Sequence, residues 1–261
     1  MNNKMLSVVI VGSGNVAEAL AVRLGASEGI ALQQIYARNA ERGSHIARLA
    51  GTTWSNDVLA EADIYLIAVS DRAVEDVATS VAFPPEALVA HTAGSVPLVA
   101  IPERKGGRGV FYPLQSFSMG RHEAIEGAPI FIEGDSEATY DRLRDLAERM
   151  GLNANVADTE RRRRLHLAGV FVNNFVNHLY ATAADIVAGE GLDFEILRPI
   201  IRETAAKAIA SANPRSVQTG PAQRGDRATI ERHMAMLEDD DTKREIYNYL
   251  TQSIWETSKK M

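Results

Sequence analysis

The sequence predicts a doubly wound α/β domain, a Rossmann-type parallel sheet, followed by a smaller all-helical domain. Two observations predict this fold class. The first half of the 261-residue chain alternates short runs rich in valine and isoleucine with helical periodicity, as in "LSVVIVG" followed by "NVAEALAVRLGAS". Runs without strict polar alternation are typical of parallel strands buried on both faces. From Thr159 onward only helical periodicity remains, so we expect domains at 1–157 and 158–261.

The elements follow a regular order. The first half begins with "LSVVIVG", "NVAEALAVRLGAS", "LQQIYAR", "NAERGSHIARLAG", "DIYLIAVS", "DRAVEDVATSVA" and "ALVAHTAG"; it continues with "GRGVFYPL", "APIFIEG", the helix "SEATYDRLRDLAERMG" and a short strand near "NANVAD". In the C-terminal part, Asp193 and Asp226 are expected helix N-caps. Gly189 and Gly191 mark a helix end.

Composition narrows the function classes. The chain has no cysteine, which excludes disulfides, thiolate chemistry and cysteine-based zinc sites, and we expect no metal. A net charge of -6 argues against nucleic acid as a partner. No apolar run approaches the roughly 20 residues of a membrane-spanning helix. We therefore expect a cytoplasmic protein. The basic run "ERRRR" at 160–164 is interpreted as a solvated first helical turn, with an anion-facing role as the alternative.

A glycine motif predicts a dinucleotide site. Gly12-x-Gly14-x-x-Ala17 directly follows the first predicted strand and opens a helix. Gly12 permits a tight turn, Gly14 lets the backbone approach a pyrophosphate, and Ala17 allows close packing of helix on strand. The expected cofactor contacts of this turn are Gly12, Ser13, Gly14, Asn15 and Val16.

The end of the second strand favours NADP over NAD. Arg38 and Asn39 stand where NAD enzymes place an acid, and Arg42 follows one helical turn later. A guanidinium can pair with a 2′-phosphate, which a carboxylate would repel. The alternative is that Arg38 is simply exposed.

Two further strand ends are placed to meet the cofactor, because ligands of open parallel sheets lie outside the carboxyl ends of the strands. Val69 and Ser70 are expected on the adenine-ribose side; His91, Thr92 and Gly94 are expected near the nicotinamide. Asp71 could instead cap the next helix, and His91 could equally be a hydrogen-bonded structural histidine.

The first helix of the C-terminal half carries a polar line. At about 100° per residue, His166, Asn173 and Asn177 fall on one side of an α-helix, while Asn174 and His178 lie off that side. Apolar residues cover the other directions, so we expect the helix to be largely buried and the line to face a ligand. A buried hydrogen-bond network is the alternative. The apolar residues are Leu165, Leu167, Phe171, Val172, Phe175 and Leu179.

The motifs "GSGNVA", "AVSDRAV", "HTAGS", "YPLQSFS", "LHLAGVFVNNFVNHLY" and "TGPAQRGD" span essentially the whole chain. Through them the chain resembles the 6-phosphogluconate dehydrogenase-like superfamily, in which a Rossmann domain precedes an all-helical one. Within that superfamily it looks like a bacterial family of NADP oxidoreductases whose C-terminal domain has no assigned function.

Two departures from related enzymes matter. Hydroxyacid dehydrogenases of the superfamily carry a lysine on the first helix of the helical domain, whereas here His166 with Asn173 occupies a comparable face. Their proton donor therefore does not transfer to this chain. Pyrroline-5-carboxylate reductases carry a "TSPGG"-type loop that lines the substrate site at a dimer interface. The loop "QTGPAQRGD" is similar in position and in its Thr-x-Pro core, and adds Arg224.

Two functions from different classes fit these residues. The first is an NADP-dependent oxidoreductase acting on a small carbonyl, imine or hydroxy substrate, in which His166 exchanges a proton and Asn173 holds the reacting atom. Arg224 would bind an anionic group of the substrate, with Thr219 and Asn177 nearby. The second is an NADP-binding regulatory or interaction protein without turnover. Tyr112 and Gln115 either line the pocket or pack their own loop.

The apolar first helix also predicts an oligomer. Its apolar surface exceeds what the three remaining helices of so small a domain cover, so we expect a homodimer built through the helical domains.

Overall fold

The structure, a computed structural model, describes residues 5–259. The chain divides into two compact units, one ending at Phe175 and the other beginning at Val176. We describe each unit by itself. The domain boundary expected at 157/158 stays a prediction.

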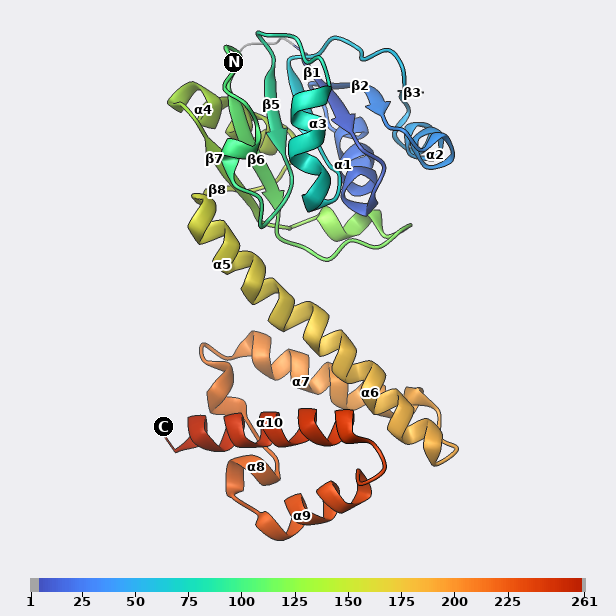
Figure 1. Ribbon diagram of the computed structural model, residues 1–261, viewed down its shortest axis with the longest axis vertical. Coiled ribbons are helices and arrows are strands. Elements are labelled where there is room, and N and C mark those ends of the chain that lie inside the picture. The colour runs from blue at the N-terminus through green and yellow to red at the C-terminus, as the bar shows by residue number, and fades with distance from the viewer. Residues whose placement is uncertain (1–4, 260–261) are drawn as a thin grey trace. The chain divides into compact units, whose positions relative to one another are not determined.

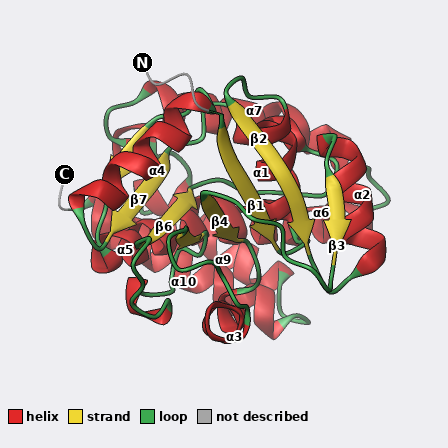
Figure 2. Cartoon of the chain, turned by 90° about the horizontal axis from the view of Figure 1, so that it is seen from above, coloured by secondary structure: helices red, strands yellow, loops and turns green. Residues whose placement is uncertain are grey.

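The first unit is built on an eight-stranded sheet in the order β3-β2-β1-β4-β5-β6-β7-β8 (Figures 1 and 2). The neighbours from β3 through β6 are parallel, which confirms the Rossmann-type sheet. Beyond them, β7 runs antiparallel to β6, and β8 runs parallel to β7. The strands are β1 (Leu6–Val11), β2 (Ile30–Tyr36), β3 (Thr53–Ser55), β4 (Ile64–Ile67), β5 (Leu88–His91), β6 (Arg108–Pro113), β7 (Ile130–Gly134) and β8 (Ala154–Val156).

Helices cover both faces of this sheet because side chains alternate along each strand. In β1, Val8 and Ile10 join the core formed with α1 (Asn15–Gly25), α2 (Ala40–Ala50) and α4 (Glu137–Arg149). Val9 and Val11 point to the opposite core, which includes α3 (Val74–Ser80). All four valine and isoleucine side chains are buried, as expected for a strand covered on both sides.

The polar helix predicted from the sequence is not a uniform α-helix. After α5 (Thr159–Gly169), residues Val170–Phe175 form a π-helical segment, and α6 (Val176–Gly189) follows. A π-helix closes its hydrogen bonds over five residues, so each residue turns the chain by less than the α-helical step. The periodicity argument that placed Asn177 on one line with His166 therefore does not hold across this segment.

Over its described residues, 176–259, every secondary-structure element of the second unit is a helix. Asp193 and Asp226 cap the helices that follow them, as expected. Gly220 and Gly225 hold positive φ angles of 106° and 66° at the two ends of α8. After α6 the helices are η5 (Phe194–Leu197), α7 (Arg198–Ala210), η6 (Pro214–Val217), α8 (Pro221–Arg224), α9 (Arg227–Met236) and α10 (Asp241–Ser258).

Within the part of the chain that the structure describes, no helix combines the length and apolarity that a membrane crossing requires.

Candidate functional site

Glycine stands at positions 12 and 14 of the first turn for two different structural reasons. Gly12 holds φ at +132°, and a Cβ atom there would lie 2.2 Å from the carbonyl oxygen of Ala68. This position therefore requires glycine. Gly14 is the extended N-cap of α1, and a Cβ atom there would meet nothing within 4 Å. The space beside Gly14 and the N–H groups at the start of α1 fit the pyrophosphate of a dinucleotide.

The start of α1 is tied to the loop between β6 and β7. Asn15 Nδ2 donates to the carbonyl of Phe117 at 3.1 Å. One turn further along α1, Glu18 Oε1 accepts from the backbone N–H of Gly120 at 2.9 Å. Glu18 is buried, although carboxylates are seldom buried without partners. The only signal of this role in the sequence is one acid in the otherwise apolar "NVAEALAV".

After β2, the polar residue that contacts the glycine turn is not one of the two that we expected there. Arg38 is exposed, and the side chain of Asn39 caps α2 by accepting from the N–H of Arg42 at 3.0 Å. Arg42 is the cation that contacts the glycine turn. Its Nε donates to the carbonyl of Ser13 at 3.4 Å, and its Nη2 lies 2.8 Å from Glu18. The cofactor roles of Arg38 and Asn39 stay predictions.

Beyond β4, Val69 is partly exposed and Ser70 is exposed. The side chain of Asp71 does not cap the next helix, which corrects the alternative considered above. The Asp71 carboxylate instead accepts a hydrogen bond from the hydroxyl of Ser95, in the loop after β5. Asp71 and Ser95 therefore join the loops that follow two neighbouring strands.

His91 is completely buried at the end of β5, and Thr92 is buried beside it. His91 Nδ1 accepts from the backbone N–H of Ala93 at 3.2 Å. Burial, and after it the nearby Arg162 guanidinium, lower the pKa of His91 to about 4. The ring is thus neutral near pH 7, and its geometry fits the structural alternative; a cofactor contact by His91 or Thr92 stays a prediction.

His166 and Asn173 share one cavity of about 410 Å³, where a ligand could reach both side chains. Tyr112 and Gln115 line it too, so the open question about their loop is answered in favour of the cavity. Asn174, which α-helical periodicity put off the polar line, also faces this space. The remaining lining residues are Leu114, Ser116, Leu165, Ala168, Gly169, Val170 and Val172. The lining combines amides, hydroxyls and one imidazole, and it includes no charged residue.

The centre of this cavity wall is a contact between Tyr112, near the end of β6, and His166 of α5. Tyr112 Oη lies 3.2 Å from His166 Nδ1, and the two rings meet edge to face. Burial, and after it the Asp71 carboxylate, raise the pKa of Tyr112 to about 12. Gly94 lies against both rings, because a Cβ atom there would come within 2.7 Å of His166 Nδ1 and 2.9 Å of Tyr112 Cζ. Gly94, expected at the nicotinamide, thus packs beneath this pair.

The interpretation of the basic run as a solvated turn is wrong for Arg162. This side chain is fully buried and forms an ion pair with Glu133 of β7. Thr159 Oγ1 donates to the same carboxylate at 3.0 Å. The partner of this cation, Glu133, lies on β7, which runs antiparallel to β6. The sequence did not indicate this strand direction. Arg163, by contrast, is exposed as expected, and it forms an ion pair with Glu160.

The expected burial of the polar helix is also wrong within the first unit. Four of the apolar side chains that were expected to be buried remain exposed there, with Val172 at 75%. The exposed side chains are Leu167, Phe171, Val172 and Phe175.

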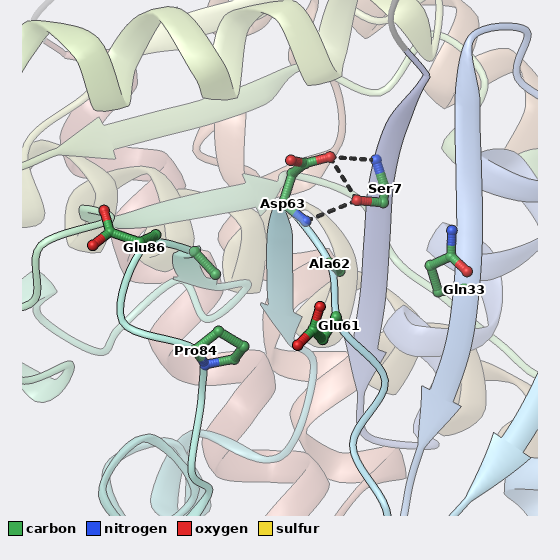
Figure 3. Close-up of a pocket in the computed structure, with 8 residues that line it drawn as sticks. Ser7, Gln33, Glu61, Ala62, Asp63, Pro84 and Glu86 are labelled. Carbon is green, nitrogen blue, oxygen red and sulfur yellow. Dashed lines mark hydrogen bonds between the residues drawn. The ribbon is translucent and has the colours of Figure 1, made fainter.

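A second cavity, of about 480 Å³, opens at the amino-terminal edge of the sheet (Figure 3). Its polar groups bind one another. Ser7 Oγ donates to Asp63 Oδ2 at 2.5 Å, and the N–H of Asp63 donates back to Ser7 Oγ at 2.9 Å. Glu61 and Glu86 make it acidic. Because open parallel sheets bind ligands at the carboxyl ends of their strands, this cavity is not the dinucleotide site.

The remaining predicted site residues belong to the second unit. Asn177, Thr219 and Arg224 are all exposed within it. Arg224 ends α8, and Asp226 caps α9 with a bond to the N–H of Thr229 at 3.1 Å. Their roles toward the substrate stay predictions.

The fold and the glycine turn define the class: a dinucleotide-binding protein with a Rossmann-type sheet and a helical C-terminal part. The model of the family "NADP oxidoreductase coenzyme F420-dependent" matches residues 7–94, and the domain of unknown function DUF2520 matches residues 128–254. A putative NADP oxidoreductase from Bacteroides fragilis is 35% identical, with a TM-score of 0.89 over 97% of this chain and 99% of that one. The chain belongs to this family of NADP oxidoreductases, in which NADP is the cofactor.

More distant structures share the fold. A pyrroline carboxylate reductase from Plasmodium falciparum with NADP bound is 12% identical, with a TM-score of 0.62 and 97% of both chains covered. An imine reductase variant from Myxococcus stipitatus in complex with NAD+ is 15% identical, with a TM-score of 0.59 over 97% of this chain and 93% of that one. None of the curated proteins matches the chain.

Proposed function

We propose that this chain catalyses NADP-dependent hydride transfer to or from a small carbonyl, imine or hydroxy compound. The observation that carries the proposal is the cavity where Tyr112, His166 and Asn173 meet, in the same unit as the glycine turn. When bound, the nicotinamide supplies or accepts the hydride. Assignment to the 6-phosphogluconate dehydrogenase-like superfamily is part of this proposal.

The chain's own residues divide the remaining work. Reduction of a C=O or C=N bond consumes one proton along with the hydride, and oxidation releases one. His166 exchanges this proton, because imidazole is the side chain best suited to do so near neutral pH. Asn173 lines the same cavity and can donate to the reacting oxygen or nitrogen through its amide.

The cavity lining of the first unit has no cation. We propose that Arg224 binds a carboxylate or phosphate of the substrate, with Thr219 and Asn177 as polar contacts. The Arg224→Ala variant tests this assignment. We expect a higher KM for anionic substrates with unchanged NADPH affinity. An unaffected KM would exclude Arg224 as the group that binds the anion.

The central test follows NADPH absorbance while purified protein meets a panel of keto acids, aldehydes and imines. We expect oxidation with at least one substrate class. The His166→Gln variant should lose turnover and keep its NADPH affinity. Binding of NADPH without turnover across the panel would overturn the proposal and favour an NADP-binding regulatory or interaction protein.

We also propose that the active form is a homodimer joined through its helical units. Among described residues 176–259, only Ala222 is buried, while Ile200 and Ile209 are 63% and 86% exposed. A helical unit that leaves so much apolar surface open needs a partner, and a second copy offers the same apolar surface. Sedimentation equilibrium is expected to give twice the chain mass of 28.4 kDa; a monomer at micromolar concentration would refute the dimer.

A further inference from the structure

The contact between Tyr112 and His166 determines which nitrogen of the His166 ring carries the proton. His166 Nδ1 lies 3.2 Å from Tyr112 Oη. Among the described residues no hydrogen bond reaches Nε2. A phenol is a stronger hydrogen-bond donor than a neutral imidazole, whose bare nitrogen is in turn a stronger acceptor than a phenol oxygen. The O–H of Tyr112 therefore donates to Nδ1, and the single proton of the neutral ring resides on Nε2.

The surroundings hold Tyr112 in the donor role. Tyr112 is only 8% exposed, and its pKa of about 12 keeps the hydroxyl protonated throughout the physiological range. Gly94 fixes the distance, because any side chain there would collide with His166 Nδ1 and Tyr112 Cζ. The rings of Tyr112 and His166, packed against Gly94, thus form a preorganised unit.

We infer that Tyr112 is the positioning residue of His166, and that Nε2 is the nitrogen that gives the proton to the substrate. The inference rests on the proposed function. In the reducing direction, the Nε2 proton passes to the lone pair of the substrate's oxygen or nitrogen. Nδ1 takes the phenolic proton in the same step, so the ring stays neutral. Afterwards Nε2 takes a proton from water while the Nδ1 proton returns to the phenolate, which restores the starting arrangement. One solvent proton is consumed for each substrate reduced. An alkoxide is a stronger base than a phenolate, so the transfer is downhill.

The first test does not need a substrate. In full-length protein with ¹⁵N-labelled histidine, the His166 ring signals are identified by their absence from the His166→Gln variant. We expect neutral His166 to carry its proton on Nε2. The Tyr112→Phe variant should show a mixture of the two neutral forms. A wild-type proton on Nδ1, or an unchanged distribution in Tyr112→Phe, would overturn the inference.

The second test uses turnover. Tyr112→Phe should lower kcat roughly tenfold or more, since acid–base groups contribute factors of about 10² to 10⁴, while KM changes little. The Gly94→Ala variant separates the two rings without removing either, and should lower kcat in the same way if Tyr112→Phe does not fold. Tyr140→Phe on α4 is the matched control, because this ring packs against the core away from the cavity, and it should leave kcat unchanged.

The outcomes separate the two claims. Wild-type protein that turns over no substrate refutes the proposed function, yet the ring signals still decide the arrangement of Tyr112 and His166. Wild-type turnover that Tyr112→Phe and Gly94→Ala leave intact refutes the inference alone.

Discussion

Arg162 of α5 lies fully buried against Glu133 of β7, and its other guanidinium nitrogen donates to the carbonyl of Val96. His166 follows four residues later, on the same face of α5. The ion pair therefore fixes the rotation of α5 about its axis, and with it the direction in which His166 leaves the helix.

Removing one partner of this ion pair should be costly. Arg162→Met leaves the Glu133 carboxylate without its cation, and breaking a buried pair costs about 3 kcal/mol of unfolding free energy. Arg163→Met is the control, since its exposed pair with Glu160 contributes less than about 1 kcal/mol. Urea unfolding measures both. Replacing Arg162 and Glu133 together by Met and Leu should restore much of the loss; equal effects of the two single arginine variants would contradict the assigned burial.

His91 should make stability fall in mild acid. Its folded pKa of about 4 lies below the usual 6.5, so the unfolded chain binds a proton that the folded chain refuses. This contribution is complete above pH 6.5 and is lost progressively as pH falls toward 4. Between pH 7 and pH 5 the loss from this residue is about 2 kcal/mol. Urea unfolding at the two pH values should show a smaller drop in His91→Gln than in wild type; equal drops would exclude His91 as the source.

The two glycines of the first turn should respond differently to alanine. Gly14→Ala places a methyl group in open space at an ordinary φ of -80°, so stability should change by less than about 0.5 kcal/mol. The methyl group would occupy the space expected for the pyrophosphate and should raise the Kd for NADPH about tenfold or more, a loss of at least ~1.4 kcal/mol. Gly12→Ala collides with the carbonyl of Ala68 and should destabilise the fold itself. Fluorescence titration with NADPH separates the cases; unchanged affinity in Gly14→Ala would remove Gly14 from the site.

Cofactor preference should depend on Arg38. The Arg38→Asp variant should bind NADPH more weakly and NADH no worse, because a carboxylate repels the 2′-phosphate. Arg38 is exposed, so stability should hardly change. Arg42→Met differs, since it also removes an ion pair with the buried Glu18 and should lower stability. Titrations with both nucleotides give the preference, and an unaltered ratio in Arg38→Asp would exclude this residue.

The α/β fold was predictable because its signals are local. The β1 residues Val8 to Val11 are all apolar and supply both cores, and the glycine motif follows them directly. The contact that requires glycine at position 12, with the carbonyl of Ala68, is by contrast long-range. His166 and Asn173 share one cavity, as expected for one polar face, although the π-helical segment lies between the two residues.

Features that depend on residues far apart in the chain could not be predicted from the sequence. Arg162 looks like its exposed neighbours in "ERRRR", because its burial depends on Glu133, which lies 29 residues away on a strand that reverses direction. The π-helical segment changes the phase between residues 170 and 175, so Asn174 reaches a cavity that α-helical counting denied it. The contact of Tyr112 with His166 spans 54 residues and leaves no pattern in the sequence.

The loop at residues 114–120 lines the cavity and also contacts α1. Gln115 and Ser116 form part of the cavity wall, while the Phe117 carbonyl and the Gly120 N–H are held by Asn15 and Glu18 of α1. The wall that we propose for the substrate is thus hydrogen-bonded to the helix whose first turn we propose for the nucleotide. Steady-state kinetics are therefore expected to show an ordered addition in which the nucleotide binds before the substrate.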